Sequence, residues 1–304
     1  MLAIAVVAGP PLVSRLVGHG PNDIFPYAVS DTLKPVGLWT RVPDTGMYSD
    51  LGPPEEKTLL VLGADGPLGR DMLLRLLDGG RASLTIALGG TLLATAIGAI
   101  LGAFAGYYRG LVDATVSRVT ELVMAFPLLF FIILLASTVA GRFDDVTLGG
   151  LLQPGALPLI LIIGCFTWFY PARIVRAEML ALRQSEFVEA ARMVGASDRR
   201  IIRSHLLVHL APSLIVYSTL LLATNILLEA GLSFLGVGIR LPTASWGSLL
   251  ATSWGTARNP SPLLPEQTTI WLTVLPSVAI LVAVLAFNLL GEGLRSALDP
   301  QRAR

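Results

Sequence analysis

Five long stretches of this 304-residue chain contain no aspartate, glutamate, lysine or arginine, and this pattern constrains the fold most. Crossing the hydrocarbon of a bilayer takes roughly 20 mostly apolar residues in a helix. Each stretch is long enough to cross once, and together they are residues 82–108, 122–141, 146–172, 204–228 and 267–291. Charged residues make up 14% of the chain, whereas soluble domains carry about 25%. The sequence therefore predicts an all-α integral membrane protein.

The first 13 residues form a further apolar stretch, which is short for a complete membrane span. We expect Pro10 and Pro11 to end this segment, because proline cannot donate the backbone hydrogen bond of a helix. A shortened membrane helix, the core of a signal peptide and a start codon placed too late are the three alternatives. We prefer the membrane helix, because no basic side chain precedes Leu2, as a signal peptide would require. Counting it, we expect about six transmembrane helices.

The placement of arginine predicts the orientation in the membrane. Seven arginines lie between the third and fourth long stretches, and loops rich in lysine or arginine remain in the cytoplasm. Alternation of the spans then leaves both chain ends in the cytoplasm. The predicted segments are a first helix at 1–13, an extracytoplasmic segment at 14–81, a membrane domain at 82–293 with a cytoplasmic loop at 176–204, and a cytoplasmic tail at 294–304.

The arginine-rich loop contains the pattern of a short amphipathic helix. Four apolar residues are spaced i, i+3, i+4 and i+7, namely Phe187, Ala190, Ala191 and Val194. Glu186 and Glu189 occupy the first turn, where acidic groups favour the helix dipole, and Gly195 suits a C-terminal cap. The apolar face either docks into a groove on a cytoplasmic partner or packs against the chain's own membrane helices. The pattern alone does not choose between these two alternatives.

Two features within or next to the predicted spans suggest functional or structural roles. Glu229 either lines a translocation path, because ionisable groups in membranes are functional by default, or makes a structural hydrogen bond at a broken helix. Gly231 and Gly236 favour the structural alternative, and Asn225 is predicted to be an interhelical hydrogen-bond partner. Small residues at every fourth position predict close packing of helices, and these are Gly98, Gly102 and Gly106.

Several classes of function are excluded by the sequence. The phosphate-binding motif G-x-x-x-x-G-K-[ST] requires lysine after glycine, but Lys34 follows leucine and Lys57 follows glutamate. We therefore predict that the chain is not an enzyme and does not hydrolyse nucleotide itself. His205 and His209 have the spacing of two metal ligands, but we interpret them as interfacial polar residues and predict no metal site. A net charge of +1 offers no footprint for nucleic acid.

The loop sequence resembles a known motif. Residues 189–191 read Glu-Ala-Ala and, with Gly195, resemble the EAA motif of ATP-binding-cassette (ABC) importer permeases. The surrounding residues 186–192 resemble the dipeptide, oligopeptide and nickel branch of that family. Two later segments are similar to the same branch, residues 229–236 and 286–300. The usual Ile-x-Leu-Pro ending is replaced by His-Leu-Leu-Val at 205–208, so the exit of the second loop helix departs from the family pattern.

This resemblance implies a type I ABC importer transmembrane fold in the inner membrane of a prokaryote. It implies that the loop couples this subunit to two ABC ATPases, which bind ATP and magnesium, so that this chain needs no cofactor. A second homologous permease, an extracytoplasmic substrate-binding protein and membrane lipid are the other implied partners, in a heteromeric complex that imports small peptides. The alternatives are a non-conducting scaffold subunit and an ion-gradient-driven secondary transporter, which would show inverted repeats and broken helices.

Overall fold

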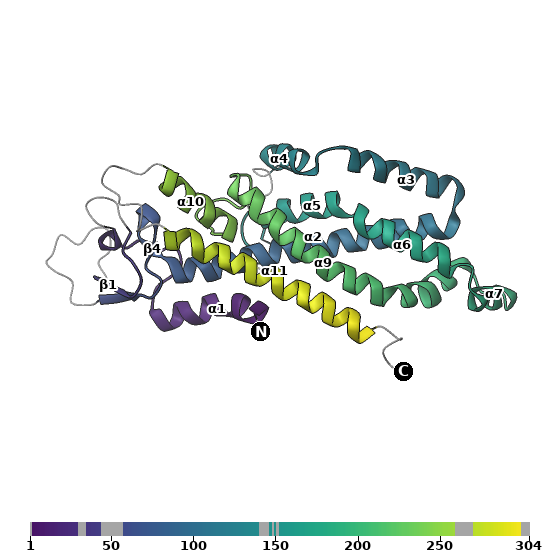
Figure 1. Ribbon diagram of the computed structural model, residues 1–304, viewed down its shortest axis with the longest axis horizontal. Helices are drawn as coiled ribbons and strands as arrows, with labels where there is room; N and C mark the ends of the chain where they lie inside the picture. The colour runs from purple at the N-terminus through teal and green to yellow at the C-terminus, as the bar shows by residue number, and fades with distance from the viewer. Residues whose placement is uncertain are drawn as a thin grey trace. The chain divides into compact units, whose positions relative to one another are not determined.

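The computed structural model describes residues 2–29, 35–43, 57–139, 146–147, 149, 152–258 and 270–298, and helices form most of it (Figure 1). The helices are α1 (Leu2–Val17), α2 (Met72–Tyr108), α3 (Gly110–Ala125), α4 (Leu128–Val139), α5 (Ala156–Thr167), α6 (Phe169–Leu182), α7 (Glu186–Met193), α8 (Asp198–Arg200), the π-helix η3 (Ile201–Leu206), α9 (Leu207–Phe234), α10 (Trp246–Arg258) and α11 (Ile270–Leu298). The chain divides into two compact units. Unit 1 comprises Met1–Ile86, Gly141–Leu157 and Ile226–Ala283, and unit 2 comprises Ala87–Ala140, Pro158–Asn225 and Val284–Arg304.

Three helical segments are long and apolar enough to cross a membrane, and these are Met72–Tyr108, Asp198–Phe234 and Ile270–Leu298. Two bent helix pairs, α3–α4 and α5–α6, raise the number to five if each pair is one span. The described residues therefore confirm a mostly helical protein with several spans. The sixth span stays a prediction, because α1 has 16 residues and is shorter than a complete span requires.

The stretch 122–141, predicted as a single span, is broken at its proline. α3 ends at Ala125, and α4 begins at Leu128 at an angle of 86° to it. Phe126 has an extended backbone, with φ −86° and ψ 141°, because the ring of Pro127 disfavours the helical conformation of the preceding residue. A single span over this stretch stays a prediction, because the two helices cross a membrane as one span only if the bent pair is counted as one. The end of this stretch lies outside the described residues.

α1 continues through Pro10 and Pro11, whereas the sequence predicts an end at these prolines. Interior prolines are tolerated in strongly apolar helices, where neighbouring groups satisfy the freed backbone. The helix ends instead at Gly18, which has φ +84° in the left-handed region that favours glycine. The Gly18 N–H donates to the carbonyl oxygen of Ser14 at 2.9 Å. The boundary predicted at residue 13 therefore moves to Val17.

α2 begins at Met72, before the start predicted at residue 82. Asp71 makes this earlier start favourable, because its Oδ1 atom accepts the backbone N–H groups of Leu73 at 2.8 Å and Leu74 at 3.3 Å. An aspartate in this position satisfies amide groups that have no partner within the helix. Residues 72–81 therefore belong to the helix α2, whereas the sequence predicts its start at residue 82.

A buried ionic cluster joins the segment before α2 to the first turn of that helix. Arg75 and Asp65 form an ion pair, and their side chains are 2% and 4% exposed. Arg70 lies on the same carboxylate, with 3.2 Å between Nη2 and Oδ2. His19 Nε2 lies 3.0 Å from Asp71 Oδ2. Burial lowers the pKa of His19, but the hydrogen bond and the charge of Asp71 outweigh it and raise this pKa above its usual value.

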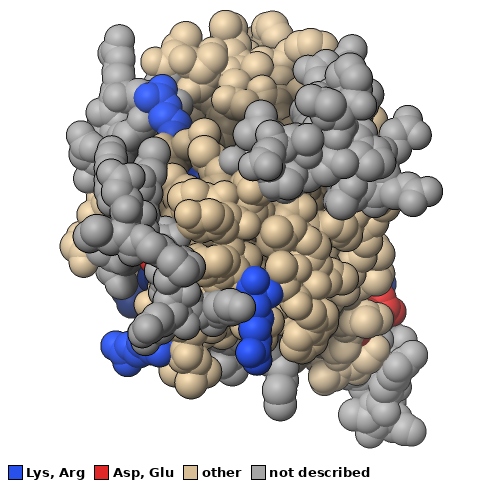
Figure 2. Space-filling view, turned by 90° about the vertical axis from the view of Figure 1, so that its left-hand side faces the viewer, with Lys and Arg blue, Asp and Glu red and all other residues tan. Residues whose placement is uncertain are grey.

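Two short antiparallel hairpins complete the outer part of unit 1. β1 (Thr40–Pro43) pairs with β2 (Lys57–Leu60), and β3 (Ala64–Asp65) pairs with β4 (Arg70–Asp71). They enclose a small apolar core of Phe25, Ala28, Val42, Leu60 and Ala64. Figure 2 shows the end that carries these strands, where uncharged side chains predominate among the described residues and a few Lys or Arg side chains stand apart. The segment predicted at 14–81 thus contains a small folded region, formed by β1–β4 and this apolar core, which we call the cap of unit 1.

In unit 2, α2 packs against α6 along the predicted glycine stripe. A Cβ atom added to Gly98 would lie 2.6 Å from the carbonyl oxygen of Trp168, and one added to Gly102 would lie 2.5 Å from that of Ala172. At Gly106 the added atom would lie 2.7 Å from a methionine Cβ of α6. A side chain at any of these positions would force the two backbones apart, so the close approach depends on glycine.

Helices extend into two of the predicted segments. In the loop predicted at 176–204, α6 continues to Leu182 and η3 begins at Ile201. The tail predicted at 294–304 begins as helix, because α11 continues to Leu298. Residues 299–304 lie outside the described part of the chain.

Candidate functional site

The helix predicted in the arginine-rich loop is present as α7. Ser185 precedes it with an extended backbone, φ −77° and ψ 150°, and its carbonyl oxygen accepts the N–H of Val188 at 3.0 Å. Gly195 follows it with φ +80°, and the N–H of Ala196 donates to the carbonyl oxygen of Ala191 at 3.0 Å. α8 then begins at Asp198. The local structure is a helix, a glycine turn and a second helix, as the residue pattern predicts.

The inner face of α7 packs onto unit 2. Val188 is fully buried, and Phe187 and Ala191 pack against the same apolar cluster. The other members of this cluster come from α2, α6, η3 and α9, and they are Ala103, Tyr107, Val175, Met179, Ile201, Leu206 and Leu210. The ring of Phe187 also stacks on that of His209, with 4.9 Å between centroids and 14° between planes. The sequence pattern does not identify Val188, which lies outside the i, i+3, i+4, i+7 series.

The outer face of α7 carries Glu186, Glu189, Ala190, Met193 and Val194, all of which are exposed. Met193 is 84% exposed and Val194 is 86% exposed, although both side chains are apolar. α7 projects beyond the neighbouring ends of α6 and α9, at one end of unit 2 (Figure 1). Packing against the chain's own helices therefore applies to part of the predicted stripe, and the other part is exposed. Phe187 and Ala191 pack inward, whereas Ala190 and Val194 face away from the described residues of unit 2.

Glu229 lies inside unit 1 and is fully buried. The hydroxyl of Ser233, one turn later in α9, donates to Glu229 Oε1 at 2.6 Å. Ser83 of α2 and Ser245, which precedes α10, are also fully buried, and the backbone N–H of Trp246 donates to the Ser83 hydroxyl at 3.2 Å. The bond to Ser233 fits a structural role, but α9 continues unbroken through Glu229 to Phe234, so the break expected at this residue is absent. Glu229 Oε2 has no hydrogen-bond partner among the described residues.

Replacing Glu229 separates the two alternatives for its role. Glu229→Gln keeps an oxygen that can accept from Ser233, so we expect a normal yield and a small change in the thermal midpoint of the purified protein. Glu229→Leu leaves the buried Ser233 hydroxyl without this acceptor, which costs about 1–3 kcal/mol and lowers that midpoint. Uptake that is lost in both variants at an unchanged thermal midpoint would instead indicate a role in translocation.

Asn225 lies in unit 2 and is also fully buried. Its Nδ2 atom donates to Thr91 Oγ1 at 2.9 Å, and Thr91 donates in turn to the carbonyl oxygen of Ala87 at 2.7 Å. The hydrogen bond connects α9 to α2, as expected of a polar side chain inside a membrane bundle. Asn225 therefore has the contacts of an interhelical partner.

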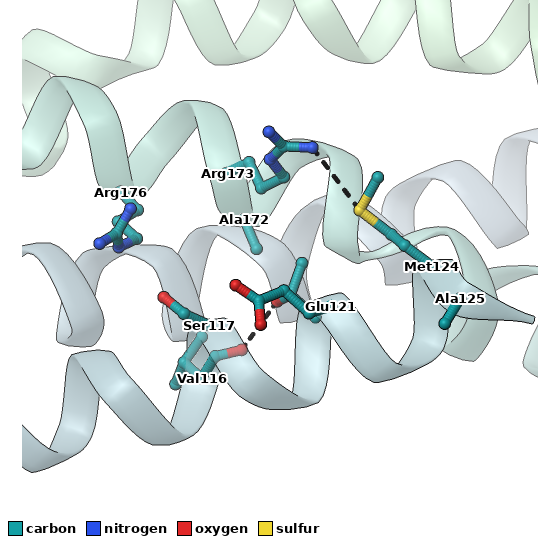
Figure 3. A pocket seen from close by; sticks show the side chains of 9 residues that line it. Val116, Ser117, Glu121, Met124, Ala125, Ala172, Arg173 and Arg176 are labelled. Atoms are coloured by element: carbon teal, nitrogen blue, oxygen red, sulfur yellow. Dashed lines mark hydrogen bonds between the residues drawn. The ribbon is translucent and has the colours of Figure 1, made fainter.

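A cavity of about 480 Å³ lies between α3 and α6 (Figure 3). Glu121 extends into it from α3 and Arg173 from α6. Arg173 Nη1 lies 3.6 Å from the sulfur of Met124. Arg176, at the same cavity, forms an ion pair with Asp113, in which Nη2 lies 2.9 Å from Oδ2. This ion pair joins α3 to α6, and the cavity combines an anionic and a cationic side chain with an apolar wall.

A second cavity, of about 500 Å³, is lined by α6, α9 and α11. Its polar lining residues are His209, Ser213, Tyr217 and Arg295. The Ser213 hydroxyl donates to Glu178 Oε2 at 2.5 Å. Because His209 also stacks on Phe187, this cavity lies next to the inner face of α7.

The two histidines spaced four residues apart do not form a ligand pair of the usual kind. His209 Nδ1 lies 2.7 Å from the backbone carbonyl oxygen of His205, so this nitrogen bonds within its own helix. Among the described residues, no group of three or more His, Cys, Asp or Glu side chains could hold a metal ion.

Comparison with known families decides the identity of the chain. The family model described as the binding-protein-dependent transport system inner membrane component matches residues 98–304, which include α7, both cavities and most of the spans. The chain belongs to this family. It is thus a permease subunit of an ABC transporter, and the ATPase activity of such a transporter lies in partner subunits. The secondary-transporter alternative is wrong.

Similar proteins align with a longer part of this permease than the family model does. A peptide permease protein of Brucella ovis is 38% identical over 239 residues, which is 79% of this chain and 72% of that protein. The oligopeptide transport system permease protein OppC of Haemophilus influenzae is 37% identical over 233 residues, covering 77% of this chain and 68% of that protein.

A solved structure supports the fold of the permease. The inward-facing MetNI methionine ABC transporter aligns with 73% of this chain and 97% of its own, at a TM-score of 0.51 and 19% identity. This likeness confirms an ABC importer type of transmembrane fold. Because the sequence identity is only 19%, this likeness supports the fold and nothing more specific.

Proposed function

We propose that this permease and a second, homologous permease form a path for small peptides through the inner membrane, driven by two partner ATPases. The outer face of α7 is the observation that carries this proposal. Ala190, Met193 and Val194 are apolar and exposed within a charged, arginine-rich segment. Exposed apolar patches of this kind are typical of surfaces that another protein covers. The names of the two relatives support peptides as the substrate.

The arginine distribution supports a cytoplasmic position for α7. Arg192, Arg199 and Arg200 are all exposed on α7 and α8, and basic loops remain on the cytoplasmic side. Alternation of the spans then places both termini in the cytoplasm and the cap of unit 1 outside. The cap is the side at which an extracytoplasmic binding protein would deliver its substrate.

Coupling follows from the two faces of α7. A partner ATPase that binds the outer face moves α7 when it closes around ATP. The inner face is packed on a cluster shared by α2, α6 and α9, so these helices receive the movement. Packed interfaces have discrete arrangements, and rocking of helix groups against each other alternates access to a central site. This permease contributes no catalytic group to ATP hydrolysis.

The cavity between α6, α9 and α11 is the candidate section of the path. Its polar residues include Arg295, which suits the carboxylate of a peptide, and Ser213, which bonds to Glu178. Because Arg295 belongs to the predicted cytoplasmic tail, this cavity would form the cytoplasmic end of the path.

The test is ATP-dependent uptake of a labelled dipeptide or tripeptide into proteoliposomes that contain both permeases, both ATPases and the binding protein. We expect accumulation that requires ATP and the binding protein, and competition by unlabelled peptide. Uptake of nickel instead of peptide would assign the other substrate of this branch. Unchanged uptake by a complex without this permease would support the scaffold alternative and contradict the proposal.

A further inference from the structure

Tyr107, the penultimate residue of α2, lies where α7 meets the membrane helices. It is 3% exposed and belongs to the same apolar cluster as Val188 of α7. Its hydroxyl donates to Asp198 Oδ1 at 2.5 Å and accepts from Arg192 Nη2 at 3.4 Å. One phenol therefore bonds to the last turn of α7 and to the first turn of α8.

Two arginines enclose the ring of Tyr107. The guanidinium carbons of Arg183 and Arg192 each lie 5.7 Å from the ring centroid, within the range of a cation–π interaction. Arg183, which follows α6, also donates from Nη1 to the backbone carbonyl oxygen of Tyr107 at 2.6 Å. This bond satisfies one of the carbonyl groups that a helix leaves without a partner at its C-terminal end.

Tyr107, Arg183, Arg192 and Asp198 together form what we call the tyrosine node. Its contacts differ in kind from those of the apolar cluster around Val188. Apolar contact is non-directional and allows one surface to slide on another. Hydrogen bonds to charged groups depend on distance and angle, so a shift of α7 relative to α2 breaks them. The node therefore ties the position of α7 to that of α2.

We propose that Tyr107 is a positioning residue that transmits the movement of α7 to α2, and this inference rests on the proposed function above. Without its hydroxyl, α7 stays attached through the apolar cluster but slides when the ATPases close. ATP hydrolysis then continues while fewer transport cycles are completed. A merely structural role would instead change the yield of complex and leave the number of peptides transported per ATP unaltered.

The neighbouring tyrosine supplies a matched control for Tyr107→Phe. Tyr108 is 47% exposed and its ring stacks on Phe104, with 5.8 Å between centroids. Among the described residues its hydroxyl has no hydrogen-bond partner, so Tyr108→Phe removes the same atom without breaking a contact. Both variants are reconstituted as the complete transporter, and peptide uptake and ATP hydrolysis are measured in the same vesicles.

We expect Tyr107→Phe to lower the number of peptides transported per ATP by roughly three- to tenfold, as loss of a charge-assisted hydrogen bond permits, and Tyr108→Phe to leave it unchanged. Asp198→Ala removes the same hydrogen bond from an exposed position, and should lower the ratio even if Tyr107→Phe assembles poorly. A ratio equal to wild type in Asp198→Ala, or in an assembled Tyr107→Phe complex, would overturn this inference alone. A wild-type complex without ATP-dependent uptake would overturn the proposed function, and this inference with it.

Discussion

Replacing Ala190 by aspartate is expected to weaken binding of the partner ATPases by roughly 30- to 1,000-fold, or about 2–4 kcal/mol. Ala190 is exposed at the centre of the outer face of α7, between Glu186, Met193 and Val194. A new carboxylate there would lose its water when a partner covers the face, and an unpaired charge is costly to bury. The permease itself should fold normally, because the side chain points away from its own core.

Ala181→Asp is the matched control for this substitution. Ala181 is also exposed and lies in the last turn of α6, outside the outer face of α7. We expect this variant to retain ATPase subunits and ATP hydrolysis through purification in mild detergent, whereas Ala190→Asp loses both. Equal ATPase activity in the two purified complexes would show that the outer face is not the docking surface.

Replacing Asp65 by alanine is expected to destabilise the cap of unit 1 by about 3–5 kcal/mol, because removal of one partner leaves a buried charge uncompensated. Arg75 and Arg70 both contact this carboxylate, and the side chain of Arg75 is 2% exposed. The effect is measured as a lower thermal midpoint of the purified protein.

Asp23→Ala provides the comparison for Asp65. Asp23 is exposed and accepts the backbone N–H of Gly20 at 2.7 Å, so its loss should cost no more than about 1 kcal/mol. Similar thermal midpoints for the two variants would mean that the buried cluster does not stabilise the cap.

Three membrane helices could be predicted because hydrocarbon excludes unpaired charge, and the stretches 82–108, 204–228 and 267–291 each fall on one long apolar helix. The other two stretches fall on the bent pairs α3–α4 and α5–α6. The beginning of α2 could not be predicted in this way. It starts with the Asp71 cap and contains Arg75, whose charge is neutralised by Asp65. That pairing depends on the fold of the cap and is not visible in a single sequence. The break at Pro127 has a local signal in the sequence, because proline can kink a helix and disfavours the helical conformation of the residue before it.

The residue spacing located α7 but did not assign its faces. Val188 is buried and Val194 is exposed, because the inner face is defined by where α2, α6 and α9 lie. Tyr107 carried no recognisable pattern. Its only signal was an aromatic pair at the end of an apolar stretch, directly before the basic residue Arg109.

The most direct test of the central claim is affinity purification of the tagged wild-type permease from mild detergent, followed by mass spectrometry and an ATPase assay. Our account predicts recovery of ATPase subunits and a second permease, with the ATPases lost when Glu189 on the outer face of α7 is replaced by arginine. A stable wild-type permease that purifies without any ATPase subunit would contradict coupling through α7.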